Sequence, residues 1–160
     1  MYAAKVLSNW LKCAIIVLAV LGLFVFGVVI PLYGLSIAAD NPEYAFCFPP
    51  WMILTVLVAI PCYAALVIGW KIAADIGRDQ SFSDHNAKRM RWISNLAFGD
   101  VLLFFCGNTM LLLLNMSHPG VFLLCLLPDL LGVAIAVCAA ALSHLIYKSA
   151  RLQDDAELTI

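Results

Sequence analysis

Four long stretches of the chain carry almost no charged residues. Each contains the roughly 20 apolar residues that a helix needs to cross a bilayer. Every backbone amide in hydrocarbon must be paired within its own segment, so we expect these stretches to be α-helices. The predicted membrane spans are, approximately, residues 13–38, 50–74, 92–115 and 121–147.

The overall composition excludes several classes of protein. Of the 160 residues, 64% are apolar and only 12% are charged, whereas about 25% of an ordinary soluble domain is charged. A soluble fold of this size could not bury so much apolar surface, so the excess must face lipid. A soluble enzyme, a disordered regulator and a protein that binds nucleic acid directly are therefore not expected. The first stretch is also about twice as long as the apolar core of a cleaved signal peptide, so we expect it to remain as a span.

The nine Lys and Arg residues predict the orientation of the chain. With four spans, all nine fall on one side of the membrane, and the two loops on the other side contain neither residue type. Because basic residues favour the cytoplasmic side, we expect a protein of the cytoplasmic (inner) membrane with both termini in the cytoplasm. The basic residues are Lys5, Lys12, Lys71, Arg78, Lys88, Arg89, Arg91, Lys148 and Arg151.

The lengths of the connections predict the arrangement of the spans. The two outer loops, near residues 40–43 and 117–120, are short, so the spans that each loop joins should be antiparallel neighbours. The two halves of the chain show no similarity of the kind that indicates an inverted-repeat transporter. The predicted fold is all-α: one polytopic membrane domain, residues 1–160, built as an antiparallel bundle of four transmembrane helices. Pro31 and Pro61 lie within spans and should kink or locally loosen them.

The cytoplasmic loop of about residues 75–91 is the largest soluble feature, and its residues predict a defined structure. Gly77 suits the C′ position, where the second helix would end in a left-handed backbone. Ser83 is a good N-cap for the helix that enters the third span, and Asp84 suits the dipole of the first turn. Phe82 directly precedes the cap and can pack onto the following turn as a hydrophobic staple.

A pattern of residues in this loop also points to a known family. The pattern runs from Ile76 through Gly77, Arg78, Asp79, Gln80, Ser81 and Phe82 to Ser83, and is followed by Asn86, Arg89 and Ile93. It resembles the signature loop of the domain-of-unknown-function 2975 family, whose members are small bacterial membrane proteins with four predicted helices and no established activity. Members of this family are often found beside a small helix-turn-helix regulator. The resemblance therefore implies that the protein acts at the membrane as the partner of such a regulator in transcriptional control. The same residues would also suit a purely structural loop made of a turn, a staple and a cap.

Two aspartates, Asp100 and Asp129, lie inside predicted spans. A charge near the middle of a bilayer costs roughly 2.5–3.5 kcal/mol on insertion scales, so each must face the interior of the bundle and be paired or protonated. Helical rise places Asp100 about 13 Å beyond Arg91 and Asp129 about 28 Å from Lys148. Measured from these basic residues, the two aspartates differ in depth by about 15 Å and should not meet.

Other polar residues are predicted as partners for the aspartates. Asn108 is near the expected level of Asp129, and Tyr63 is near the expected level of Asp100. His144 is shallower and could reach Asp100 only if side chains bend. Such contacts would be polar interactions that hold neighbouring helices of the bundle together. A path for protons or a ligand, and contacts to a partner protein, are the alternatives.

No arrangement of residues predicts a catalytic, cofactor or metal site. An intramembrane aspartyl protease needs two adjacent carboxyls, whereas Asp100 and Asp129 are expected at different depths. The three histidines are too scattered to hold a metal. The six cysteines contain no Cys-x-x-Cys pair, which argues against a disulfide oxidoreductase. Cys47 and Cys125 both lie toward the outer side, and their pairing stays open.

Two functional hypotheses follow. The first is a non-enzymatic membrane protein that contacts a cytoplasmic regulatory protein through the loop of residues 71–91 and the tail of residues 151–160, because soluble features occur only on the inner side. The second is a small transporter or proton-linked channel that uses Asp100 and Asp129. A chain of this size can also form a homo-oligomer, so a pore built from several copies stays open. The lipid bilayer is the one partner that the composition itself requires.

Overall fold

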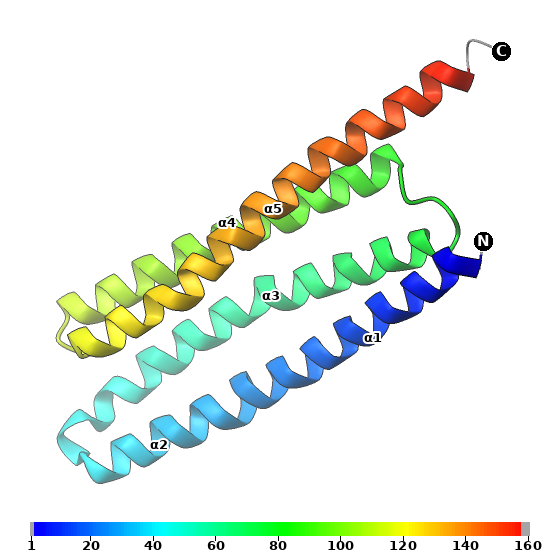
Figure 1. Ribbon diagram of the computed structural model, residues 1–160. Helices are drawn as coiled ribbons and strands as arrows, with labels where there is room; N and C mark the ends of the chain where they lie inside the picture. Colours follow the sequence, from blue (N-terminus) through cyan, green and yellow to red (C-terminus); the bar gives the residue numbers. More distant parts are fainter. Residues whose placement is uncertain (1, 158–160) are drawn as a thin grey trace.

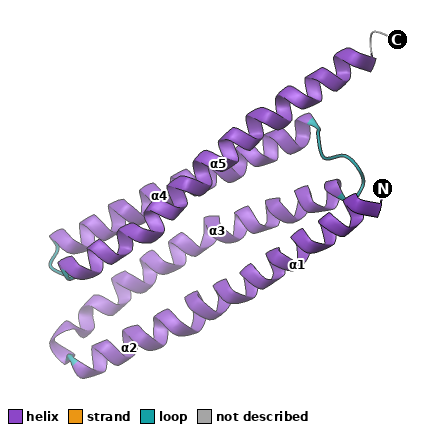
Figure 2. Ribbon diagram, in the orientation of Figure 1, coloured by secondary structure: helices purple, strands orange, loops and turns teal. Residues whose placement is uncertain are grey.

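A computed structural model describes residues 2–157 of the chain, and these residues form helices joined by short connections (Figures 1 and 2). The prediction of an all-helical chain with four helices long enough to span a membrane is confirmed. The four candidate spans are Tyr2–Asp40, Pro42–Ile76, Asp84–Leu113 and Pro119–Leu152. The elements are α1 (Tyr2–Phe24), the π-helical segment η1 (Val25–Val29), α2 (Ile30–Asp40), the 3-10 segment η2 (Pro42–Cys47), α3 (Phe48–Ile76), α4 (Asp84–Leu113) and α5 (Pro119–Glu157).

The helices pack side by side in chain order, each antiparallel to the next (Figure 1). The unit of α1, η1 and α2 packs on α3, α3 packs on α4, and α4 makes the most extensive contact with α5. Among the described residues, no Cα atom of α1 or α2 comes within 8 Å of a Cα atom in α4 or α5. The bundle is therefore open between its first and last helices. Most large apolar side chains face outward, as contact with lipid requires.

Small residues allow the helices to approach one another closely. A Cβ atom built on Gly132 of α5 would lie 2.5 Å from Val101 Cγ2 on α4. A Cβ atom on Gly107 of α4 would likewise overlap Leu54 of α3. Close backbone approach at small residues is typical of helix association in lipid, where apolar burial alone provides little driving force.

Buried serine hydroxyls set the register between α4 and α5. Ser94 Oγ donates a hydrogen bond to the Ala136 carbonyl at 2.8 Å, and Ser143 Oγ donates to the Ala87 carbonyl at 2.8 Å. Ser94 and Ser143 are both buried, so these bonds form away from solvent. The two contacts together show which residues of the antiparallel helices lie at the same depth.

The two prolines predicted to disturb the spans behave differently. Pro31 follows directly after η1 (Val25–Val29) and Ile30, so the first helical unit is locally widened into π-helix before the proline. A proline cannot donate to the carbonyl four residues earlier, and a π-helical turn is one way to accommodate this loss. Pro61 lies inside α3, which continues as an α-helix on both sides.

All nine Lys and Arg residues gather at one end of the molecule, which we call the basic end. There α1 begins, α3 ends, α4 begins and α5 ends (Figure 1). Ser8 Oγ donates to the Ala73 carbonyl at 2.6 Å and joins the start of α1 to the end of α3. Lys12 lies 5.6 Å over the ring of Trp70 at the same end. The opposite end, with η2 and the connection between α4 and α5, is called the distal end.

Candidate functional site

The connection between α3 and α4 starts with a tightly hydrogen-bonded turn. Asp79 has a left-handed backbone (φ 64°). The N–H groups of Asp79 and Gln80 donate to the carbonyls of Ile76 and Asp75 at 3.1 and 3.0 Å. This is the Schellman pattern that ends many helices. The left-handed residue is therefore Asp79, and the prediction that Gly77 takes this position is wrong.

Gly77 has an ordinary helical backbone (φ −65°) and is required by a close contact between helices instead. A Cβ atom at this position would lie 2.8 Å from Ser8 Oγ and 3.1 Å from Ser8 Cβ. Ser8 is only 2% exposed, so it has little room to move away. Gly77 thus lets the start of α1 pack against the end of α3.

The start of α4 is capped as predicted. Ser83 Oγ accepts a hydrogen bond from the backbone N–H of Asn86 at 3.3 Å, and an acidic residue stands in the first turn. Phe82 remains 53% exposed, so little of its ring can act as the predicted hydrophobic staple. Of the other predicted loop residues, Arg78 is exposed and Ser81 is half-buried.

Asn86 connects the turn to α4, and its side chain is fully buried. Its Nδ2 donates to the Gln80 carbonyl at 2.9 Å, and its Oδ1 accepts from Arg89 Nη1 at 3.1 Å. The same nitrogen of Arg89 forms an ion pair with Asp75 at the end of α3. This network joins the last turn of α3, the connection and the first turn of α4 into one unit. Asn86 and Arg89 were selected from the sequence, whereas Asp75 was missed because its ion pair depends on how the turn folds.

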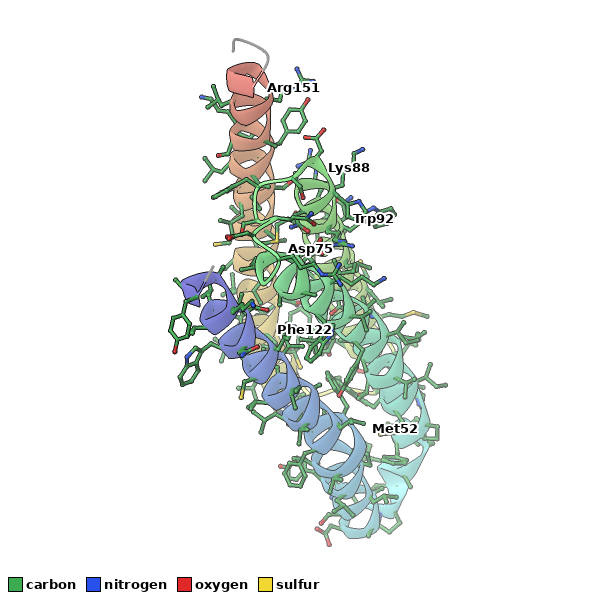
Figure 3. All side chains as sticks on the ribbon, turned by 90° about the vertical axis from the view of Figure 1, so that its right-hand side faces the viewer. Met52, Asp75, Lys88, Trp92, Phe122 and Arg151 are labelled. Carbon is green, nitrogen blue, oxygen red and sulfur yellow. The ribbon has the colours of Figure 1, made fainter. Side chains whose placement is uncertain are left out.

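The last turns of α5 project beyond this unit at the basic end. Because Ser143 lies opposite Ala87, the first residue of α4 lies opposite residue 146. Residues 148–157, called the α5 arm, therefore extend about 15 Å past α4 (Figure 1). The Arg151 guanidinium lies 5.0 Å over the ring of Tyr147, and Leu152 is 62% exposed. Figure 3 shows Arg151 on the arm, well beyond Asp75 in the connected unit.

The two intramembrane aspartates lie at nearly the same depth, and the predicted separation of about 15 Å is wrong. Ser94 lies opposite Ala136, so Asp100, six residues further along α4, lies opposite residue 130, next to Asp129. The close contact at Gly132 gives the same result to within one helical turn.

The depth prediction failed because Arg91 and Lys148 do not mark the same level. In the observed register Arg91 lies opposite Ala139. Lys148 is nine residues further along α5, which corresponds to about 14 Å. Lys148 therefore lies on the projecting arm, beyond the level of Arg91. The depth of Asp129, when counted from Lys148, is too large by about 14 Å, which accounts for nearly all of the predicted separation of about 15 Å between the two aspartates.

Asp100 contacts Cys62 on α3 rather than Tyr63. Cys62 Sγ donates to Asp100 Oδ2 at 3.2 Å, while the buried Oδ1 of Asp100 has no hydrogen-bond partner. The Tyr63 hydroxyl donates instead to the Ala19 carbonyl of α1 at 2.9 Å. The predicted contact between Asp100 and Tyr63 is wrong because adjacent residues on a helix point about 100° apart.

The remaining predicted partners are also separated from the aspartates. Asp129 is 8% exposed, and Asn108, only 1% exposed, lies nearer the distal end. Asn108 Nδ2 donates to the Phe104 carbonyl of its own helix at 3.0 Å, and its buried Oδ1 has no partner. No hydrogen bond therefore joins Asn108 to Asp129. His144 is exposed beside the start of α4 and lies too near the basic end to reach Asp100.

A family model described as "Protein of unknown function (DUF2975)" matches residues 33–160. The chain belongs to this family. The matched region begins within α2 and includes the loop that carries the resemblance, together with Asp100 and Asp129. A search of the curated proteins and a search of the solved structures each found no match to the chain.

In this DUF2975 protein, the chemistry available inside the membrane comes from carboxyl and thiol groups. No hydrogen bond joins Asp100 to Asp129, because Asp100 Oδ2 accepts from Cys62 and its Oδ1 has no partner. All six cysteines are free, so Cys47 and Cys125 form no disulfide. The two carboxyls lie at one level of the bundle, and the orphaned Oδ1 of Asp100 can accept one more hydrogen bond.

Proposed function

We propose that the protein is a non-enzymatic component of the cytoplasmic membrane that binds a cytoplasmic regulatory protein through its basic end. The α5 arm carries this proposal, because it projects about 15 Å beyond α4 and exposes Arg151 and Leu152. The distal end offers only the short η2 segment and the connection of residues 114–118. Among the described residues, the α5 arm and the connection between α3 and α4 therefore support a binding surface at the basic end.

The positions of the basic residues support a cytoplasmic location for this end. The nine Lys and Arg residues at one end match the bias of cytoplasmic loops in membrane proteins. Reporter fusions after residues 42, 80, 118 and 160 test this orientation. We expect residues 80 and 160 in the cytoplasm, and residues 42 and 118 outside it. An external position for residue 80 or 160 contradicts the proposal.

The surface at the basic end combines charged and apolar side chains. Arg78 and Phe82 are exposed on the connection between α3 and α4, and Leu152 is exposed on the arm. The hydrogen-bonded network of Asn86 and Arg89 holds the connection in one conformation, which lowers the entropic cost of binding. In sequence, the end of the arm also carries Asp154, Asp155 and Glu157, which favour a basic partner. A helix-turn-helix regulator, the partner class that the family resemblance implies, has such a basic surface.

Capture of partners from native membranes in mild detergent tests the proposal. The tagged full-length protein should retain a cytoplasmic protein, and R78E or L152D should reduce its recovery. The matched control is E43R, an exposed charge reversal at the distal end, which should leave recovery unchanged. If R78E and L152D behave like the unaltered protein, or if E43R has the same effect, the basic end does not bind the partner.

A proton-linked channel or small transporter is the second candidate, and the common depth of Asp100 and Asp129 favours it. Two carboxyls at one level could both lie on a single proton path through the bundle. The change to D100N or D129N preserves shape and removes the ionisable group. Each variant should lower proton flux in vesicles loaded with a pH-sensitive dye, whereas D40N at the distal end should not. Unchanged flux in D100N and D129N would eliminate this candidate.

A further inference from the structure

A cavity of about 910 Å³ opens at the distal end between α2, η2, α3 and the connection from α4 to α5. Its size lies within the range of roughly 300–1,000 Å³ found for pockets that bury drug-sized ligands. The wall is mainly apolar and aromatic, with Tyr33 on α2 and Phe48 and Met52 on α3. Figure 3 places Met52 at this end of the molecule, far from Arg151.

Specific contacts hold the frame of the cavity in place. Trp51 Nε1 donates to the Met116 carbonyl at 3.0 Å and joins α3 to the connection between α4 and α5. Gly34 lacks a side chain where the ring of Phe48 packs against α2. The cavity reaches Val29, the last residue of the π-helical segment η1, so the irregular part of the first helical unit forms part of its wall. The space is therefore lined by segments from both halves of the chain.

Several polar residues are among those that line this otherwise apolar space. Ser117 lines the cavity, and its hydroxyl oxygen is buried without a hydrogen-bond partner. Asn41, Asn115 and His118 also line it. His118 Nδ1 accepts a hydrogen bond from the Gly120 N–H at 3.0 Å, so the neutral ring carries its proton on Nε2. The lining residues include no Lys, Arg, Asp or Glu.

We infer that the cavity binds a neutral amphiphile from the membrane leaflet at the distal end, a lipid with an uncharged hydroxyl-bearing head. The apolar wall suits an acyl or isoprenoid chain, and the unpartnered Ser117 hydroxyl supplies a hydrogen bond for the head. A charged head would find no opposite charge among the lining residues, so its transfer into the apolar space would be unfavourable. The cavity therefore discriminates against anionic lipids with the same chains.

Fluorescence quenching of Trp51 tests this binding directly. Trp51 lines the cavity, whereas Trp10, Trp70 and Trp92 belong to the helix segments at the basic end. The full-length protein with W10F, W70F and W92F is reconstituted in phosphatidylcholine vesicles, so Trp51 is the single reporter. The probes are diacylglycerol and phosphatidylglycerol that carry identical brominated acyl chains. Diacylglycerol should quench with saturation at low mole fraction, and phosphatidylglycerol only in proportion to its concentration.

Matched substitutions locate the binding within the cavity. A38F fills space at a lining residue and should abolish saturable quenching, whereas A39F adds the same ring on the exposed side of α2 and should not. S117A, which removes a hydroxyl and adds no bulk, should weaken diacylglycerol binding roughly two- to tenfold. The control S36A removes an exposed hydroxyl outside the cavity and should have no effect.

Three results would overturn the inference. These are equal quenching by the two probes, stronger quenching by phosphatidylglycerol, and unchanged saturable quenching in both A38F and S117A. If A38F does not fold, S117A measured against S36A still decides the outcome. The inference does not rest on the proposed partner, because Trp51 quenching is measured on the purified chain and partner capture depends on the opposite end.

Discussion

Replacing Gly77 with Ala should destabilise the protein even though the backbone there is helical. At φ −65° alanine fits without strain and would by itself favour the helix by about 0.5–1 kcal/mol. The added Cβ would lie 2.8 Å from Ser8 Oγ, and Ser8 is buried with its hydroxyl bound to the Ala73 carbonyl. Overpacking of this kind costs about 1–3 kcal/mol. The expected net loss is about 1 kcal/mol in the free energy of unfolding.

A double-mutant cycle with Ser8 identifies the cause of this loss. S8A removes one interhelical hydrogen bond, at a cost of about 0.6 kcal/mol in a membrane protein. The Ala73 carbonyl keeps its bond from the Gly77 N–H at 3.2 Å, so it is not left unpaired. With the hydroxyl gone, G77A should cost half as much or less. The coupling energy between the two sites should be about 0.5–1 kcal/mol.

Reversible unfolding of the full-length protein in mixed micelles, followed by circular dichroism, measures each term of the cycle. G99A is the matched control, because a Cβ on Gly99 of α4 meets no atom within 4 Å. It should leave stability unchanged or raise it by up to about 1 kcal/mol. If G77A costs the same with and without Ser8, the close contact is not the reason for glycine, and the reasoning is refuted.

Three further changes test other contacts in the same unfolding assay. Asn115 has a left-handed backbone (φ 55°) just after α4, so N115A should destabilise by about 1 kcal/mol and N115G should not; equal effects would contradict the backbone argument. N86A breaks the buried bond to the Gln80 carbonyl and should cost about 1–3 kcal/mol, and a loss below about 0.5 kcal/mol would show that the network is not stabilising. G132A forces a Cβ against the stiff side chain of Val101 and should cost about 1–3 kcal/mol, much of it restored by V101A; a silent G132A would disprove the close approach of α4 and α5.

Local signals in the sequence were sufficient for the elements near the loop. Ser83 caps α4 as predicted because an N-cap depends on residues within one turn of it. The end of α3 was predicted less well, since both Gly77 and Asp79 are compatible with a left-handed C′ position. Asp79 takes that position, and Gly77 is needed for a contact with Ser8 on another helix. No short-range pattern connects residues so far apart in the chain.

The intramembrane residues show the same limit more strongly. The sequence showed that Asp100 and Asp129 enter the membrane, because charge is costly there and rare in this chain. Their relative depth required the register between α4 and α5, which the bonds of Ser94 and Ser143 set. The predicted partner Tyr63 was one residue from the actual partner, Cys62, because helix rotation about its axis is not visible in hydropathy.

By itself, the sequence determined four apolar helices, their antiparallel order and the gathering of all nine basic residues at one end. These properties follow from the free energy of placing each residue in lipid or water, which depends on residue type and position along the chain. The tertiary structure alone decided which residues share a level, why Gly77 is small, and where the distal cavity lies. Those properties depend on how side chains distant in sequence interlock, and a one-dimensional pattern does not record that packing.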